Sequence, residues 1–343
     1  MPKVTISELA RRAGVSKTAV SFAFNSPARL SAATAKNILA IAEELGYTPS
    51  PVARSMNTGR TGTIGVLMPQ PIPEIIRNPF LPEFLEGVGE ICTQAKLSLM
   101  LVPPMEGSMR RAITNAAVDG FLTLGLEEFK STMVVLRQRG VPYVTVDSDP
   151  IDGVPGVNID DEGGARAVMR HVLAAGHREI VIVAIRSGKN AHYQEYAGTL
   201  RDRVNGYLVA LAEYGAAIDG RRVRLLEAPS TEQGGREAMG RILKARRKPT
   251  AIVTMSDIIA IGAMRTALEA GLRLPEDLSF AGFDDIPLAA WVSPALTTVA
   301  QPACRKGQLA AELLLKIFEG KSDLTHHLLP AELVVRASVV SVP

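Results

Sequence analysis

The chain has 343 residues, of which 47% are hydrophobic and 21% are charged, and it contains only 2 cysteines. This length predicts two or three domains, and the hydrophobic content is sufficient for well-filled cores. The low cysteine count argues against a disulfide framework, and no apolar run approaches the ~18–20 residues that span a bilayer. Because the N-terminus lacks the apolar stretch of a signal peptide, we expect a cytoplasmic protein with no membrane partner.

The positive charge is concentrated at one end of the chain. Residues 1–62 hold eight Lys or Arg against three Glu and no Asp, which gives a net charge of +5, whereas the remaining residues sum to −2. A basic first domain on a near-neutral body indicates contact with a polyanion at that end. Nucleic acid is the first candidate, although many small soluble domains are mildly basic.

The first sixty residues predict three short helices. Thr5, followed three residues later by a glutamate, has the spacing of a capping box and opens the first helix. Gly14 breaks this helix and supplies a tight turn, after which Ser16 can cap a second helix. Ser31 opens a third helix, which stops at Gly46. Two short helices joined by a glycine turn and braced by a third predict a helix-turn-helix domain.

The second helix is the element expected to contact DNA. Its outer side carries Lys17, Thr18, Ser21, Phe22 and Asn25, whereas its apolar side faces the other two helices. In a helix-turn-helix domain the second helix enters the major groove, where its N-terminal residues reach the base edges. We therefore predict that this outer side contacts double-stranded DNA.

Residues 48–63 read as a linker between two domains. Pro49 and Pro51 interrupt regular structure, yet Ser50 can cap a helix of about two turns over residues 52–57. Isolated helices shorter than ~12–15 residues are marginal in water. We expect this segment to become helical only when something holds it, and a plain flexible tether is the alternative.

From residue 63 onward, apolar runs alternate with amphipathic stretches. The runs are 63–69, 97–103, 120–125, 142–147, 179–185, 222–228, 251–256 and 279–284. This alternation predicts parallel sheets covered by helices on both faces, arranged as one barrel or two open sheets. Polar residues follow several runs, at Asp147, 256–257 and 284–285. Because open sheets bind ligands at the carboxyl ends of their strands, two lobes with a ligand between them is the simpler interpretation.

The sequence lacks signatures of catalysis or of metal binding. It contains no G-x-x-x-x-G-K or G-x-S-x-G motif, and no spacing of His and Cys resembles a zinc site. The adjacent carboxylates at 160–161 and 284–285 could suggest acid–base chemistry, but neighbouring residues of a strand point to opposite faces. We therefore expect no enzyme, no cofactor and no metal.

Several segments resemble the lactose-repressor (LacI) family of bacterial regulators. The N-terminal block VTISELARRAGVSKTAVSFAFN is the most specific, and ELGYTPSPVARSMNTGRTGTIGV continues it. The resemblance then runs through residues 78–88, 157–180, 249–264, 279–285 and 294–302 in family order. It therefore covers essentially the whole chain.

The resemblance implies an all-α helix-turn-helix headpiece in residues 1–48, a hinge helix in 49–62 and an α/β core in 63–343. The core is expected to have two lobes like a periplasmic binding protein, with two doubly wound parallel sheets. Three crossings of the chain would place about residues 63–161 and 302–324 in the first lobe and 162–301 and 325–343 in the second. The family also implies a homodimer, and the tail lacks the heptads of tetrameric relatives.

The resemblance assigns roles in DNA binding residue by residue. The first two residues of the recognition helix and one a turn later read bases in the family, which implies Lys17, Thr18 and Phe22. Arginine is usual at the third position, so Phe22 is a departure that allows only apolar contact, for example with a thymine methyl group. Met56 occupies the hinge position at which an apolar side chain, usually leucine, enters the minor groove. The other implied contacts are Thr5, Ser16, Ser21, Asn25, Ser31, Tyr47 and Ala53.

The implied effector site lies between the lobes. Arg203, in the pattern Arg-x-x-Gly, matches the arginine that binds the ligand, and Asp284 and Asp147 match acidic positions of the site. Ser256 stands where many members have asparagine, and Phe80 is expected to line the first lobe. One arginine among acceptors suits a sugar or a related polyhydroxylated ligand, because hydroxyl groups both donate and accept. A structural ion pair between Arg203 and Asp284 is the alternative.

Together these expectations describe a transcription regulator that acts as a repressor. Its affinity for a near-palindromic operator would be controlled by a small molecule. A ligand-binding protein without DNA function is the main alternative, and the basic headpiece argues against it. A sugar-converting enzyme is a second alternative, disfavoured by the missing catalytic groups. Trp291 corresponds to a position near the subunit interface of the family, which favours packing between subunits over stacking on a ligand.

Overall fold

The computed structural model describes residues 4–50, 55–56, 58–68, 72–125, 130–186, 192–321 and 325–342. The chain divides into two compact units, residues 1–62 and residues 63–343. Within the described ranges, no helix is long and apolar enough to cross a membrane. The same ranges contain no group of three or more His, Cys, Asp or Glu residues that could hold a metal ion.

The N-terminal unit is a bundle of three short helices. They are α1 (Ile6–Arg12), α2 (Lys17–Asn25) and α3 (Ala32–Glu44), with the 3-10 turn η1 (Pro27–Arg29) before α3. Thr5, Ser16 and Ser31 cap these helices, each accepting a backbone N–H from three residues on at 3.3, 3.1 and 3.1 Å. Gly14 and Gly46 have φ values of +65° and +62°, which only glycine adopts at little cost. The predicted caps and turn are therefore confirmed.

A small apolar core holds the three helices together. Leu9, Val20 and Ile38, one from each helix, have no exposed surface, and alanines fill the space around them. Because the alanines are small, the helices can approach closely, and the apolar side of α2 is buried in this contact. The opposite side of α2 is consequently left facing outward.

The first lobe of the core is built on a six-stranded sheet with the order β11-β5-β4-β3-β1-β2. Its described pairings are all parallel. The strands are β1 (Thr63–Leu67), β2 (Ser98–Val102), β3 (Gly120–Leu124), β4 (Tyr143–Val146), β5 (Gly156–Ile159) and β11 (His327–Leu329). The helices are α5 (Ile72–Ile75), α6 (Phe80–Gln94), α7 (Met109–Asn115), α8 (Lys130–Arg139) and α14 (Ala303–Phe318).

Helices cover both faces of this sheet. Residues of α6 and α14 form one buried cluster with the strands, and residues of α7 and α8 form another. Helices α6 and α14 approach at two glycines, since a Cβ at Gly87 would lie 1.9 Å from the Cys304 carbonyl oxygen and one at Gly307 would lie 2.1 Å from that of Phe84. This close approach fixes the position of α14, which starts next to the candidate site.

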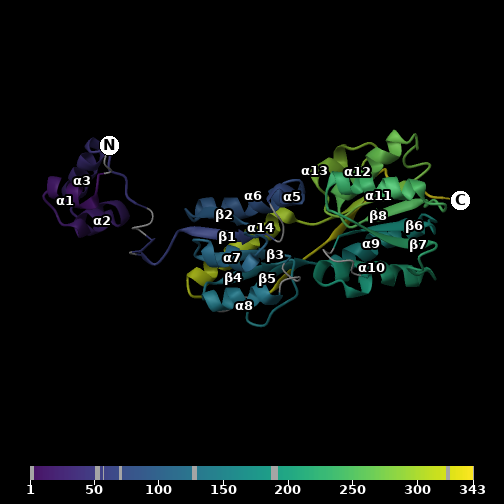
Figure 1. Cartoon of the computed structure of the whole chain (residues 1–343), viewed down its shortest axis with the longest axis horizontal. Coiled ribbons are helices and arrows are strands. Elements are labelled where there is room, and N and C mark those ends of the chain that lie inside the picture. The colour runs from purple at the N-terminus through teal and green to yellow at the C-terminus, as the bar shows by residue number, and fades with distance from the viewer. Residues whose placement is uncertain are drawn as a thin grey trace. The chain divides into compact units, whose positions relative to one another are not determined.

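The second lobe repeats the arrangement on a four-stranded parallel sheet with the order β7-β6-β8-β9. Its strands are β6 (Ile180–Ile185), β7 (Val223–Ala228), β8 (Ala251–Thr254) and β9 (Ser279–Ala281). Its helices are α9 (Asp161–Ala174), α10 (Gly198–Glu213), α11 (Glu232–Lys244), α12 (Asp257–Glu269) and α13 (Pro287–Trp291), with the 3-10 turn η3 (Tyr193–Glu195) before α10. Of the two expected alternatives, two open sheets are the one observed (Figure 1).

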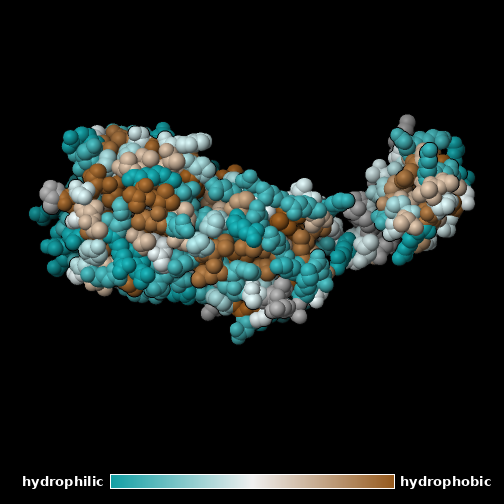
Figure 2. Space-filling model, turned by 180° about the vertical axis from the view of Figure 1, so that it is seen from behind, coloured by the Kyte–Doolittle hydropathy of each residue, from teal (hydrophilic) through white to brown (hydrophobic). Residues whose placement is uncertain are grey.

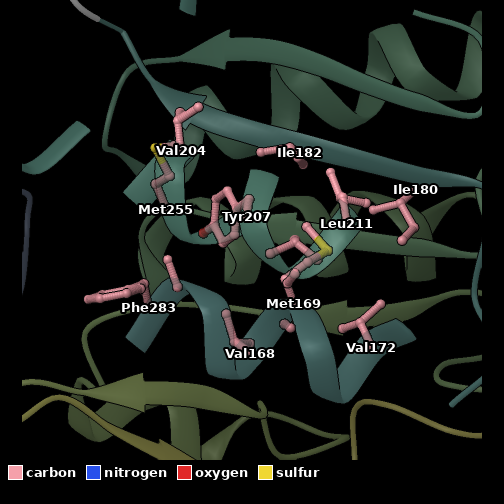
Figure 3. Close-up of a cluster of buried hydrophobic side chains, with 14 of the residues drawn as sticks. Val168, Met169, Val172, Ile180, Ile182, Val204, Tyr207, Leu211, Met255 and Phe283 are labelled. Atoms are coloured by element: carbon pink, nitrogen blue, oxygen red, sulfur yellow. The ribbon is translucent and has the colours of Figure 1, made fainter. Parts of the chain in front are cut away.

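Each face of the second sheet has its own apolar cluster. Helices α9 and α10 pack on one face and α11 and α12 on the other. Figure 3 shows the first cluster, in which Tyr207 from α10 lies among side chains such as Val168, Met169 and Ile182. The helices packed on both faces fix the positions of these strands. The polar residues of the site begin at the carboxyl ends of the strands.

The end of the chain returns to the first sheet before it finishes in the second lobe. Strand β11 pairs in parallel with β5, with His327 opposite Val157. The expected start of the second-lobe tail at residue 325 is therefore corrected to a point after Leu329, because the edge of β5 takes up this segment. Strand β12 (Glu332–Val334) then pairs antiparallel with β10 (Thr298–Ala300).

Candidate functional site

The outer side of α2 presents a row of polar and aromatic side chains. Lys17, Thr18 and Asn25 are exposed, whereas Ser21 and Phe22 are half-buried. The Asn25 side-chain amide donates to the Ser21 carbonyl oxygen at 3.0 Å and lies 3.4 Å from its hydroxyl. The predicted DNA-reading residues therefore share one accessible face, and the last turn of that face is held by an internal hydrogen bond.

A residue that the sequence analysis did not single out lies against this face. The Arg29 guanidinium carbon lies 5.1 Å from the centroid of the Phe22 ring. Arg29 comes from η1, seven positions after Phe22, so neither helical periodicity nor motif spacing pointed to the contact. The basic character of the headpiece was the one available signal.

The other expected DNA contacts fall into two groups. In the headpiece, the hydroxyl groups of Thr5, Ser16 and Ser31 cap the three helices. The Tyr47 ring packs against the Phe24 ring, with 5.7 Å between their centroids. Burial raises the pKa of Tyr47. In the hinge, residues 55, 56 and 58 are helical, and Met56 is 81% exposed. Ala53 lies outside the described residues.

In the core, Arg203 of α10 is buried among four partners. Its Nε donates to Asp161 Oδ1 at 2.7 Å and its Nη1 donates to the Met255 carbonyl oxygen at 2.6 Å. The guanidinium carbon lies 3.7 Å from the centroid of the Phe283 ring, and Nη1 lies 4.0 Å from Asp284 Oδ1. The predicted pair of Arg203 and Asp284 is thus adjacent, but Asp161 is the nearer carboxylate.

Both carboxylate oxygens of Asp284 accept hydrogen bonds. The Ser256 hydroxyl donates to Oδ2 at 2.8 Å, and the Gln301 side-chain amide donates to Oδ1 at 2.6 Å. The backbone φ of Asp284 is 128° and that of Asp147 is 52°, both in the region that favours glycine. Strained conformations of this kind concentrate at functional sites, where the surrounding structure holds them.

The first lobe contributes a buried cation. Lys306 of α14 is fully buried, and its Nζ donates to Asp147 Oδ1 at 2.7 Å and to Gln301 Oε1 at 2.8 Å. The same nitrogen lies 5.1 Å from the centroid of the Phe80 ring. The Gln301 amide therefore bridges the cation of the first lobe to Asp284 of the second.

A second chain of hydrogen bonds connects Asn78 through Ser230 and Ser256 to Asp284. The Asn78 amide nitrogen lies 3.4 Å from the Ser230 hydroxyl, which lies 3.2 Å from the Ser256 hydroxyl. Asn78 Oδ1 accepts from the Phe80 backbone N–H at 3.1 Å. We call the whole set the interlobe cluster: Asn78, Phe80, Asp147, Asp161, Arg203, Ser230, Ser256, Asp284, Gln301 and Lys306.

Comparison with known proteins places both units of the chain. Residues 5–50 match the bacterial regulatory proteins of the lacI family, and residues 169–339 match the periplasmic binding protein-like domain. An HTH-type transcriptional regulator of Mycobacterium tuberculosis is 34% identical over 331 residues, covering 92% of this chain and 91% of that protein. The repressor PurR of Photobacterium profundum is 32% identical over 344 residues, covering 98% of each.

The chain belongs to the LacI family. Among solved structures, a complex of the transcriptional regulator CelR with cellobiose matches with a TM-score of 0.70 and 27% identity, over 98% of this chain and all of that one. The LacI-family chain is accordingly a transcription regulator with a DNA-binding domain, and not an enzyme. The expected fold, a helix-turn-helix headpiece with a two-sheet α/β core, is confirmed.

All five expected effector residues of this LacI-family chain lie in the interlobe cluster, namely Phe80, Asp147, Arg203, Ser256 and Asp284. Five further members were missed. Lys306 sits in the amphipathic helix α14, where a lysine is ordinarily expected at the surface. Asn78 and Gln301 stand within the family-like segments 78–88 and 294–302 but were assigned no role there, and Ser230 stands outside these segments. Asp161 was read as a strand residue beside Asp160, but Asp160 caps α9 and Asp161 starts that helix.

Burial sets the protonation behaviour of the acidic groups. Desolvation raises the pKa of Asp284 to about 6, and the nearby Arg203, Ser256, Gln301 and Lys306 oppose the rise. Burial also raises the pKa of Asp161, with Arg203 opposing it. Both aspartates are therefore easier to protonate than an exposed carboxylate.

A neighbouring carboxylate adds to this effect. Asp257 has no exposed surface, and burial followed by repulsion from Asp284 raises its pKa well above the usual value. It accepts from the Thr298 hydroxyl at 2.5 Å and from the Ile286 backbone N–H at 3.1 Å. These bonds tie α12 to the segments on either side of α13.

Proposed function

We propose that this protein is a homodimeric repressor that binds a near-palindromic operator through α2 and is controlled by a polyhydroxylated effector bound at the interlobe cluster. The observation that carries the proposal is the cluster itself. It joins buried charged groups of both lobes, Lys306 with Asp147 and Arg203 with Asp161 and Asp284, at the carboxyl ends of the strands. Open α/β sheets bind ligands at this edge.

The chemistry of the cluster supports a hydroxyl-rich effector. Its charged groups are already paired with one another, so a ligand must offer both donors and acceptors to replace the partners it displaces. Hydroxyl groups do both, and the Phe80 ring supplies an apolar face beside Lys306. The cellobiose complex of CelR, a similar regulator, supports a sugar.

Dimerisation is supported by the surface of the core. Trp291 is 79% exposed and Leu328 is 67% exposed, and Figure 2 shows hydrophobic residues gathered in patches on the core. Large exposed apolar patches mark interaction sites. Two subunits related by a two-fold axis would present two copies of α2 to inverted half-sites. We expect a dimer and not a tetramer, and sedimentation at micromolar concentration checks this.

Thermal unfolding with a panel of neutral monosaccharides and disaccharides, including cellobiose, tests the effector. A ligand that binds only the native state raises the unfolding temperature by mass action. Gel shift on randomised duplexes with inverted repeats tests DNA binding separately. A sugar that stabilises the protein and changes its affinity for selected DNA supports the proposal. Stabilisation without any change in DNA affinity would exclude effector control, and failure to select any sequence would exclude operator recognition.

A further inference from the structure

The contact between Arg29 and Phe22 lies on the outer side of α2, the side proposed above to bind DNA. Phe22 lies on the outer side of α2, half-buried, and Arg29 is exposed. The guanidinium carbon lies 5.1 Å from the ring centroid, within the range of a cation–π interaction. Such a contact between an exposed cation and a half-buried ring contributes modestly to stability, but it restricts the direction of the Arg29 side chain.

The turn after α2 brings Arg29 back over the helix. The Ser26 N–H donates to the Phe22 carbonyl oxygen at 2.8 Å, and the Arg29 N–H donates to the Ser26 carbonyl oxygen at 3.0 Å. Pro27 opens η1, and the Leu30 N–H closes it by donating to the Pro27 carbonyl oxygen at 3.0 Å. A short hydrogen-bonded turn of this kind holds its side chains in place better than an open loop.

Arg29 keeps its hydrogen-bonding capacity. Within the described ranges, no residue accepts a hydrogen bond from its side chain, and no carboxylate pairs with it. A guanidinium group stacked on a ring leaves its N–H edges pointing outward, and these edges match the O6 and N7 acceptors of guanine in the major groove. The outer side of α2 itself offers one cation, Lys17, at the opposite end of the helix.

We propose that Arg29, held on the Phe22 ring, reads a guanine in each operator half-site, while the ring edge contacts the neighbouring base. The inference rests on the proposed binding of DNA by α2. Arg29 thus brings to the outer side of α2 a planar fork of donors that the helix itself does not carry. The two side chains then act as one reading element, and Phe22 positions Arg29 in addition to its own apolar contact.

The alternative role for an exposed arginine is contact with a phosphate. Phosphate contacts position a protein without reading sequence, whereas base contacts discriminate. Loss of a phosphate contact weakens binding to all sequences alike. It also lowers the slope of log affinity against log salt concentration by about one. Loss of a bidentate contact to guanine removes a preference at one position, worth roughly 5- to 150-fold. The two roles therefore give different results in one experiment.

Selection from duplexes with randomised inverted half-sites provides the test, with full-length protein throughout. The wild type should enrich a symmetric pair of guanines. Arg29→Ala should reduce that preference by roughly 5- to 150-fold, and Arg29→Lys should also lose it, because an ammonium group lacks the planar fork of donors. Phe22→Leu should weaken the preference by roughly 2- to 5-fold through loss of the stack, whereas Phe22→Tyr should keep it.

Arg11→Ala is the matched control, since it removes one exposed positive charge from α1 and should lower affinity without changing base preference. Thermal unfolding checks each variant, and Arg29→Lys remains informative if Phe22→Leu is unfolded. Equal losses on all sequences in Arg29→Ala, recovered in Arg29→Lys, would assign Arg29 to a phosphate and overturn the inference. An unchanged preference in Arg29→Ala would overturn it as well. If the wild type enriches no sequence, the proposed operator binding fails first.

Discussion

Lys306 and Asp147 form an ion pair inside the core, between α14 and the end of β4. The lysine Nζ lies 2.7 Å from Asp147 Oδ1, and the lysine side chain has no exposed surface. The two residues are 159 positions apart in the chain. A buried charge that loses its partner retains its cost of desolvation, so the pair makes α14 and β4 depend on each other.

Removal of the positive charge of Lys306 should reveal how far α14 and β4 depend on this ion pair. Lys306→Met should lower the free energy of unfolding by about 3–5 kcal/mol, because Asp147 is left largely buried without its partner. Addition of Asp147→Asn should recover part of the loss, with a coupling energy of ~1 kcal/mol or more. Urea unfolding of the two single variants and the double variant measures this. Strictly additive losses would show that the pair has no energy of its own.

Asp284→Asn should abolish the response to the effector while leaving operator binding largely intact. The carboxylate accepts from Ser256 and Gln301 with its two oxygens, and an amide can replace only one of these acceptors. The response to be lost is the coupling between sites, typically ~1–3 kcal/mol or 5- to 150-fold in DNA affinity. Titration of operator DNA with and without the identified sugar measures it.

Asp285→Asn provides the control, because Asp285 pairs with Arg336 at 2.6 Å and lies outside the interlobe cluster. Its response to effector should match the wild type. An Asp284→Asn variant that still responds fully would move the effector site elsewhere in the core.

The raised pKa of Asp284 predicts a specific dependence of stability on pH. Its native pKa is about 6, whereas an unfolded aspartate has a pKa of about 3.9. Between these values the native state binds more protons than the unfolded state, so this group makes the protein less stable as pH rises from about 4 to 6. The groups that face it are Arg203, Asp257 and Lys306.

The difference in unfolding free energy between wild type and Asp284→Asn isolates this contribution. It should shift in favour of the variant as pH rises through that window and level off above about pH 7. His177 acts in the opposite direction, since burial lowers its pKa, and its effect cancels in the difference. A difference that stays constant from pH 4 to pH 7 would contradict the assigned pKa.

Tyr207→Phe should leave the protein as stable or make it more stable. The Tyr207 ring lies in the apolar cluster of Figure 3. It has no exposed surface, and its hydroxyl has no hydrogen-bond partner among the described residues. An unsatisfied buried polar group costs ~1–3 kcal/mol, which the variant avoids. Thermal unfolding of the two proteins decides the matter. A clear loss of stability would mean that the hydroxyl has a partner, such as a buried water molecule.

Met56→Ala should reduce the bending of operator DNA and weaken specific binding, with little change in non-specific binding. Met56 is 81% exposed on a short helical segment, and an apolar side chain can wedge between base steps at a cost of a few kcal/mol. Energy transfer across labelled operator DNA compares the bend induced by the two proteins. If the wild type and Met56→Ala bend the operator equally and bind it with equal affinity, the segment around Met56 acts only as a tether.

The sequence by itself determined the elements whose signals are local. The caps at Thr5, Ser16 and Ser31 and the turn at Gly14 need only neighbouring residues, because a capping hydroxyl reaches a backbone N–H three positions away. The apolar runs likewise identified eight strands, β1 to β4 and β6 to β9, but not β5 or β10 to β12. Burial on both faces of a parallel sheet requires continuous apolar residues, which gives such strands a local signal. Family motifs then placed Arg203 and Asp284 in one site.

Tertiary structure alone decided which groups meet. Asp161 reaches Arg203 across 42 positions, and Lys306 reaches Asp147 across 159, so no window of sequence contains either pair. The burial of Lys306 depends on the close approach of α6 and α14, and the place of Arg29 depends on the path of the chain through η1. The pairing of β11 with β5 was equally hidden, because a three-residue strand has no periodicity of its own and is fixed only by the sheet edge that receives it.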